Sequence, residues 1–412
     1  MFLMDKMIHR DIFREIFKCF EEDDMKEFRL ISKNIKQIID EIYFYNLYFN
    51  IKKVKYNENK IINIYNVDSC YNINNFEKLR YIRFKKRFNG SIDNLPKTVT
   101  HIRFTRYSKF NETIDKLPSQ LICLELGDKF NKSVDNLPKS LTYIKFGYRF
   151  NQKINNLPKS IKQIIFYKYS KFNQPIDNLP ESVFYIKFGE KYNKRLDNLS
   201  DYITHIIFTK YSKFNRTINK LPLLITHLTF GEKFNKPVDN LPETIIFLKF
   251  GKDFNQKIDN LPQSIKKLIF YRYSEFNQPV DNLPKSITKL VFGEYFNQSV
   301  DKLPQSITHL EFGLWFNQPV DNLPQSITHL TFGWKFNQSV DNLPKSITYL
   351  EFGSDFNQSL DNLPQSITYL EFNWQYNQKI NFEKIPKLKE LIIRGDYAYK
   401  YTLPKNIKII YL

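Results

Sequence analysis

The chain has 412 residues, a formal net charge of +19, 42% hydrophobic and 16% aromatic residues, and three cysteines. This hydrophobic content is sufficient for a packed core, and so few cysteines argue against a disulfide framework and for a reducing compartment. The N-terminus carries charge too early for a signal peptide, and no apolar run approaches membrane-spanning length. We expect a monomeric protein of the cytoplasm or nucleus, without membrane contact.

The N-terminal stretch 7–48 has the periodicity of helices. Ile12, Ile16 and Phe20 lie on one face of a predicted amphipathic helix. Four consecutive acidic residues follow, and a second apolar stripe begins at Phe28. This stretch therefore predicts a small head of two or three short helices.

A single unit repeats from residue 85 to 380. Residues 316–333 give its form, FNQPVDNLPQSITHLTFG, and its Phe-Asn or Tyr-Asn start occurs fifteen times. Ten of the fourteen intervals between starts are 20 residues and four are 22. A fixed period of this length is typical of a solenoid, in which each coil packs only against its neighbours.

Two irregular stretches flank the repeats. Residues 49–84 are strand-prone and rich in Tyr, Asn, Ile and Lys, and we expect them to form a linker and degenerate N-terminal strands. Residues 381–412 are expected to form atypical C-terminal coils or a cap, because terminal repeats usually deviate from the pattern.

The hydrophobic pattern within one coil predicts a short strand. Between Thr328 and Phe332 the residues alternate, so Leu330 and Phe332 are expected to face inward. Gly333 suits a tight corner, and a proline in almost every return path leaves little room for an α-helix. We therefore expect a mainly β solenoid with turns or extended chain on its convex side. The Asn after each anchoring aromatic, such as Asn317, is expected to bond the backbone of a neighbouring coil.

The repeated pattern Phe-Asn-x-x-Val/Ile, followed by Leu-Pro-x-Ser-Ile-x-x-Leu-x-Phe-Gly, resembles the FNIP repeat, which is related to short leucine-rich repeats. The resemblance implies a leucine-rich-repeat-like fold that binds other proteins. FNIP repeats are typical of social amoebae and of large DNA viruses that infect them, so the resemblance is compatible with a viral protein acting in a host cell.

The helical stretch resembles an F-box. Ile16-Phe17 matches the Ile-Phe core of that family, Asp23-Asp24 its acidic turn, and Ile31-Ser32-Lys33 its Ser-Lys step, whereas Ile8-His9 replaces its opening Leu-Pro. The resemblance implies a substrate receptor of a cullin-RING ubiquitin ligase, in which the F-box binds a Skp-type adaptor and the repeats bind the target protein. The residues expected at the adaptor contact or in the core of the head are Ile12, Ile16, Phe17, Phe20, Phe28 and Ile31. The alternative is a helical cap on a protein-interaction scaffold without a role in ubiquitination.

The sequence contains no cluster of groups with the matched roles that catalysis requires. Five of the six histidines share one outward position, just before an inner Leu or Ile. Two stacked imidazoles fall short of the three or four ligands of a metal site. We expect no catalytic residue, metal or cofactor.

The outward strand positions vary while the inward ones repeat, which suggests a partner-binding strand face. The members of this predicted face are Tyr81, Arg83, His101, Arg103, Tyr143, Lys145, Tyr185, Lys187, His205, His227, Phe247, Lys249, His309, Glu311, His329, Tyr349, Glu351, Tyr369 and Glu371. Its charge grades from basic to acidic along the chain, so a partner is expected to bring acidic groups to one end and basic groups to the other. Unselected drift of surface residues is the alternative, and nucleic acid on the basic N-terminal repeats is a third hypothesis.

The four 22-residue coils each add a Tyr-Ser pair after the strand, at 107–108, 169–170, 211–212 and 273–274. The added tyrosines predict an aromatic rim. Packing between coils and a second contact site are both compatible with it.

Overall fold

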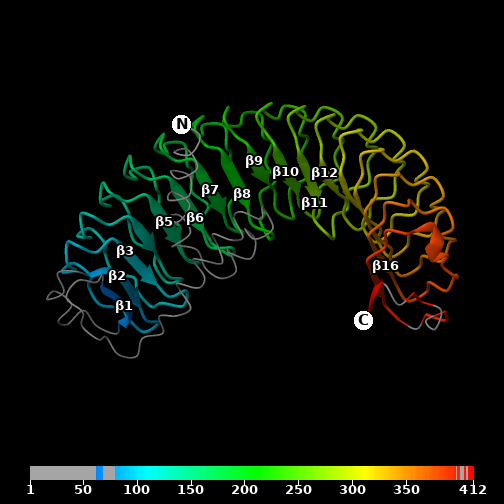
Figure 1. Cartoon of the computed structure of the whole chain (residues 1–412). Helices are drawn as coiled ribbons and strands as arrows, with labels where there is room; N and C mark the ends of the chain where they lie inside the picture. The colour runs from blue at the N-terminus through cyan, green and yellow to red at the C-terminus, as the bar shows by residue number, and fades with distance from the viewer. Residues whose placement is uncertain (1–61, 68–78, 396, 400–402, 405–406) are drawn as a thin grey trace, which may run out of the picture. The chain divides into compact units, whose positions relative to one another are not determined.

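The computed structural model describes residues 62–67, 79–395, 397–399, 403–404 and 407–412 (Figure 1). The chain divides into two compact units, 1–165 and 166–412. The predicted helical head lies outside the described residues. Within the described ranges the only helix is a single 3-10 turn, η2 (Phe382–Lys384). Nothing in these ranges supports an F-box-like head.

In the N-terminal unit the described residues form five parallel strands, each paired with the next one along the chain. Their bounds are β1 (Ile62–Val67), β2 (Leu79–Phe84), β3 (His101–Phe104), β4 (Cys123–Glu125) and β5 (Tyr143–Phe146). Strand β6 (Gln163–Phe166) contains the boundary between the units.

The C-terminal unit continues the same construction from β7 to β18, again with each strand parallel to its successor. The bounds are β7 (Tyr185–Phe188), β8 (His205–Phe208), β9 (His227–Thr229), β10 (Phe247–Phe250), β11 (Lys267–Phe270), β12 (Lys289–Val291), β13 (His309–Glu311), β14 (His329–Thr331), β15 (Tyr349–Glu351), β16 (Tyr369–Phe372), β17 (Glu390–Ile393) and β18 (Lys408–Tyr411). Within this unit the strands lie on the inner side of the curve that the coils follow (Figure 1). Each unit is thus a parallel β-solenoid, and the predicted mainly β class is confirmed.

Two columns of phenylalanine form the core. In one coil Phe332 ends the strand region and Phe336 begins the next repeat, and their rings stack at 3.7 Å between centroids. Along the array, Phe336 stacks on Phe316 at 6.1 Å and on Phe356 at 6.0 Å. All four rings are buried, together with the aliphatic positions predicted to face inward, such as Leu330. Burying an aromatic side chain in every coil explains why a coil without a helix is stable.

The predicted asparagine ladder is confirmed. The side-chain oxygen of Asn317 accepts the backbone N–H of Asn337 at 2.9 Å, and that of Asn337 accepts the N–H of Asn357 at 2.9 Å. The same bond bridges coils that are 22 residues apart, as from Asn215 to Asn193 at 3.1 Å. The ladder satisfies a backbone donor at each corner, where no strand partner is present.

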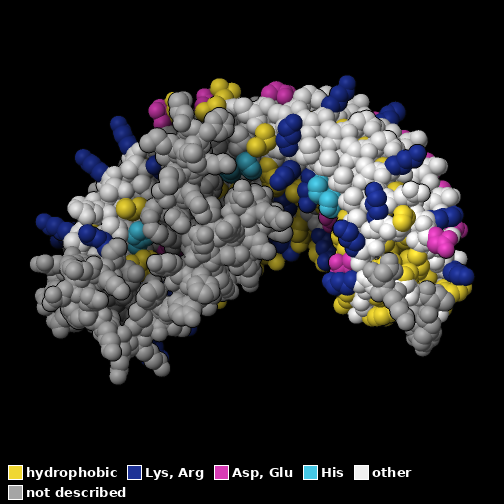
Figure 2. All heavy atoms as spheres, viewed as in Figure 1, with side chains coloured by type: hydrophobic (Ala, Val, Ile, Leu, Met, Phe, Trp, Pro, Cys, Tyr) yellow, Lys and Arg dark blue, Asp and Glu magenta, His cyan; other side chains and the backbone are white. Residues whose placement is uncertain are grey.

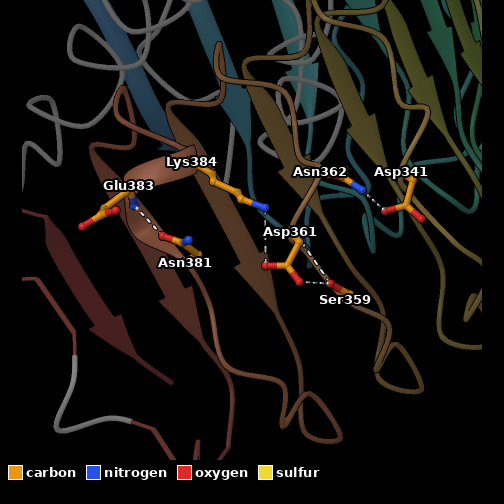
Figure 3. Close-up of polar contacts among 7 residues, drawn as sticks. All are labelled: Asp341, Ser359, Asp361, Asn362, Asn381, Glu383 and Lys384. Atoms are coloured by element: carbon orange, nitrogen blue, oxygen red, sulfur yellow. Dashed lines mark hydrogen bonds and ion pairs between the residues drawn. The ribbon is translucent and has the colours of Figure 1, made fainter.

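The return path is held by side chains of adjacent coils (Figure 3). Asn362 donates to the Asp341 carboxylate of the preceding coil at 3.0 Å, and within its own coil Ser359 donates to Asp361 at 2.8 Å. At the irregular end, Lys384 reaches Asp361 at 4.0 Å. The Asp-Asn pair of the repeat therefore links one coil to the next in addition to forming the turn.

Corners differ between the two coil lengths. A Cβ atom on Gly333 would overlap the carbonyl group of Gly313 in the coil before it, so close stacking requires glycine in this column. In a 22-residue coil the column holds a larger residue, and a serine such as Ser274 comes to lie against the glycine of the next coil, Gly293. Ser274 is fully buried and accepts the backbone N–H of Phe276 at 3.3 Å.

Candidate protein-interaction surface on the strand face

Parallel pairing in register places the outward positions in two straight columns, here called the strand face. In the C-terminal unit, His309 pairs with His329 and Tyr349 with Tyr369, all in the first column. Glu351 pairs with Glu371 in the second. The sequence therefore identified correctly which residues share each column.

In the N-terminal unit the expected exposure is wrong for several positions. Both faces of β5 are buried, with Tyr143 5% and Lys145 7% exposed. On β3 and β4, the Arg103 guanidinium binds the Glu125 carboxylate at 3.0 Å, and Lys145 approaches the same carboxylate at 4.0 Å. Two cations that suggested nucleic-acid binding at this end are thus partly neutralised. At the start of the C-terminal unit, Tyr185 on β7 is likewise buried, with 5% exposed, although it was expected to be accessible.

Four histidines form two stacked pairs on the strand face of the C-terminal unit. The rings of His205 and His227 stack at 4.2 Å, as do those of His309 and His329. Burial lowers the pKa of His205 to about 3, and the neighbouring His227 adds to the shift. Burial lowers the pKa of His309 as well, with further contributions from the neighbouring His329 and nearby lysines, and burial and Lys289 lower the pKa of His329. The paired rings are therefore neutral at physiological pH and serve as flat contact surfaces.

Cations occupy the middle of this face. Lys249 lies on β10, Lys267 on β11 and Lys289 on β12, and all three are half-buried. The Phe247 ring beside them stacks on His227 at 5.6 Å. This part of the surface combines positive charge with aromatic area.

Carboxylates occupy the far end. The Tyr349 and Tyr369 rings stack at 4.2 Å, and their hydroxyls donate to Glu351 at 3.0 Å and Glu371 at 2.6 Å respectively. Arg394 donates to Glu371 at 2.6 Å. Burial and the neighbouring Glu371 raise the pKa of Glu351, because two carboxylates in one half-buried cluster repel each other. A cation from a partner would relieve that repulsion.

Several structural features were not found from the sequence. Arg394 lies beyond the regular repeats, so no spacing pointed to it. Trp315, Trp334 and Trp374 are 46%, 52% and 70% exposed, and the signal available was that all three fall at the corner just after a strand. Cys123 is disulfide-bonded, which a reducing compartment does not predict.

Three further expectations concern the adaptor contact, a metal site and a membrane span. The proposed adaptor contacts at 12–31 are outside the described residues. Among the side chains that the structure describes, no three His, Cys, Asp or Glu residues are grouped so that they could hold a metal ion. No described helix is long and apolar enough to cross a membrane.

The repeats match the model of the FNIP Repeat at residues 130–169, 214–253, 234–273, 276–315, 316–355, 340–362 and 356–396. Together these matches span more than half of the chain. The chain belongs to the FNIP repeat family. A comparison of this FNIP protein with curated proteins gives no match.

One solved structure supports the fold of this FNIP protein, and two others show a weaker similarity. CroV588, described as a novel circular LRR protein, is similar at 30% sequence identity and a TM-score of 0.55, over 82% of this chain and 67% of that chain. LIC12759 of Leptospira interrogans matches at 12% identity and a TM-score of 0.48, over 79% of this chain and 87% of its own. InlJ of Listeria monocytogenes matches at 11% identity and a TM-score of 0.45, over 73% of this chain and 64% of its own. The match to CroV588 places the FNIP coils among leucine-rich-repeat-like solenoids.

Proposed function

We propose that this FNIP protein is a protein-interaction scaffold that holds a partner along the strand face from β8 to β16. The supporting observation is the contrast between the two sides of these strands. The inward residues are Leu, Ile or Phe in every coil and are buried. The outward residues change between aromatic, His, Lys, Glu, Thr and aliphatic along the array, and apart from Glu371 they retain solvent access. Stacked repeats with a variable outer column are suited to reading an extended partner.

The charge order on this face defines the chemistry of the partner. Lysines lie on β10 to β12, and carboxylates lie on β13, β15 and β16 at Glu311, Glu351 and Glu371. The partner is therefore a protein segment that carries basic groups opposite the carboxylates and acidic groups opposite the lysines. In Figure 2 histidine side chains lie among hydrophobic and charged ones on the strand side of the coils.

Charge reversal at the accessible carboxylates tests this proposal. Glu311 and Glu351 are suitable, whereas Glu371 is only 3% exposed and bound to Arg394, so its reversal would also disturb the fold. A partner is captured with the intact chain as bait, identified and titrated. The double variant Glu311→Lys, Glu351→Lys is expected to bind it at least tenfold more weakly.

The matched control is Glu181→Lys with Glu383→Lys, two exposed carboxylates away from the strand face. This variant is expected to bind like the parent chain. Equal affinity for all three proteins, or an equal loss in both variants, would contradict a binding role for the strand face.

A narrower function, substrate receptor of a cullin-RING ubiquitin ligase, is supported by the F-box resemblance of residues 8–42 alone. It predicts that the chain co-purifies with a Skp-type adaptor and that Ile16→Asp with Phe17→Asp abolishes the association. Failure to retain the adaptor, under conditions where an ordinary F-box protein does, would leave the scaffold without a ubiquitin role.

A further inference from the structure

The 22-residue coils share a local arrangement that the 20-residue coils lack. In each of them a Lys or Arg precedes the added tyrosine and packs against its ring. The distances from the cationic group to the ring centroid are 4.7 Å for Arg106 and Tyr107, 5.2 Å for Lys168 and Tyr169, 5.0 Å for Lys210 and Tyr211, and 5.6 Å for Arg272 and Tyr273. The following serine is buried and fixes the corner, so the tyrosine and its cation are held toward solvent.

The added tyrosines of three of these coils, at 169, 211 and 273, lie in the C-terminal unit, and the side chains around them join into one strip. The Tyr169 and Tyr211 rings stack at 5.4 Å although a 20-residue coil separates them. Lys210 also lies 5.0 Å from the Tyr271 ring, and Tyr271 meets Tyr273 edge to face at 5.7 Å. We call this strip, with Lys168, the Tyr–Lys rim.

A row of lysines follows the rim. The residue before the anchoring aromatic is lysine in four successive coils, and each of these lysines is exposed: Lys171, Lys191, Lys213 and Lys233. Glu190 is bonded by two of them, Lys191 at 2.9 Å and Lys213 at 3.4 Å, and both lower its pKa. Lys233 is bonded to Asp253 at 2.8 Å. Two carboxylates for the four lysines of the row leave a surplus of positive charge. Ion pairs this exposed contribute little and exchange readily for a stronger anion.

We propose that the Tyr–Lys rim binds single-stranded nucleic acid. Proteins that hold single strands without sequence preference combine a cationic track for the phosphates with aromatic rings for the bases. The rim supplies both, with Tyr211 38% and Tyr273 46% exposed. This site is separate from the strand face and does not depend on the partner proposed there.

An acidic protein segment and a duplex fit the rim less well. Carboxylates would use the lysines but leave the tyrosine rings without a matching group. Paired bases in a duplex are not available for stacking on side chains, so a duplex would use only the charges. A single strand uses both features, because its bases are unpaired and each nucleotide contributes a backbone phosphate.

Fluorescence anisotropy with a labelled oligothymidylate of about 20 nucleotides tests the proposal on the full chain. Lys210→Glu with Lys213→Glu is expected to weaken binding at least tenfold. The slope of log affinity against log salt should fall by about 1.4, since each phosphate contact on a single strand contributes about 0.7. Tyr211→Ala with Tyr273→Ala should weaken binding about tenfold with little change in slope, because stacking releases no counterions.

Lys285→Glu with Lys345→Glu is the matched control, since both lysines are exposed on the return path, and it should bind like the parent. Circular dichroism confirms that each variant is folded. No binding at 50 mM salt would overturn the proposal, as would an equal loss in the control pair. Poly-glutamate binding as tightly as the oligonucleotide would assign the rim to acidic proteins instead.

Discussion

The side-chain oxygen of Asn317 accepts two hydrogen bonds from the next coil, one from the backbone N–H of Asn337 at 2.9 Å and one from the side-chain amide of Gln338 at 3.1 Å. A single oxygen thus joins two coils at the corner where strand pairing has ended. This explains why Phe-Asn-Gln recurs as a unit, since the aromatic fills the core while the two amides bind coil to coil.

Asn317→Ala is expected to lower the free energy of unfolding by about 1–3 kcal/mol, because the half-buried N–H of Asn337 loses its acceptor. Urea denaturation followed by circular dichroism measures the loss. Hydrogen exchange should also show faster exchange of the Asn337 amide. The control is Asn322→Ala, which removes only an exposed bond to Asp301 and should cost less than about 0.5 kcal/mol. Similar losses in both variants would contradict a special role for the ladder.

Gly333→Ala tests the close approach of coils at the corner. The new Cβ would overlap the carbonyl of Gly313, so the coils must separate, at a cost of about 2–4 kcal/mol. Gly90→Ala is the matched control, because the nearest atom to its Cβ would be 3.7 Å away on the Phe88 ring. Thermal unfolding should show a clear drop in Tm for the first variant and little change for the second. A tolerated Gly333→Ala would mean that the column is not set by packing.

The sequence predicted the coil well, because its period determines which side chains face the core and which share a column. It could not predict the burial of Tyr143 and Lys145, since strand alternation separates the two sides of a strand but does not say what covers the outer one. Arg394 was missed because it lies after the last regular repeat. The Tyr–Lys rim was only half visible, since the Tyr-Ser insertions are in the sequence but the contact between Tyr169 and Tyr211 depends on the three-dimensional stacking of coils.

Acid should destabilise the C-terminal unit through His205. Its pKa is lowered to about 3 in the folded chain and is near 6.5 in the unfolded chain, so the unfolded state binds the extra proton below pH 6.5. The free energy of unfolding therefore has its full value above pH 6.5. It decreases as the pH falls below that value, by up to about 2 kcal/mol at pH 5. Urea denaturation at pH 7.5 and pH 5 measures the difference. His205→Gln should reduce it, whereas His309→Gln, at an exposed ring, should change it less. An unchanged pH dependence in His205→Gln would contradict this assignment.

A double-mutant cycle measures how Arg394 supports the acidic end of the strand face. Glu371 is buried, and its carboxylate accepts hydrogen bonds from the Arg394 guanidinium at 2.6 Å and from the Tyr369 hydroxyl at 2.6 Å. Arg394→Ala should lower the free energy of unfolding by about 1–3 kcal/mol, because it leaves a buried carboxylate without its cation. Glu371→Gln removes that charge, so adding Arg394→Ala to it should cost much less. The difference is the coupling energy, expected at about 1–2 kcal/mol and measured from urea titrations of the four proteins. Additive losses would mean that the two side chains act independently, and that Arg394 does not hold Glu371 beside the carboxylate of Glu351.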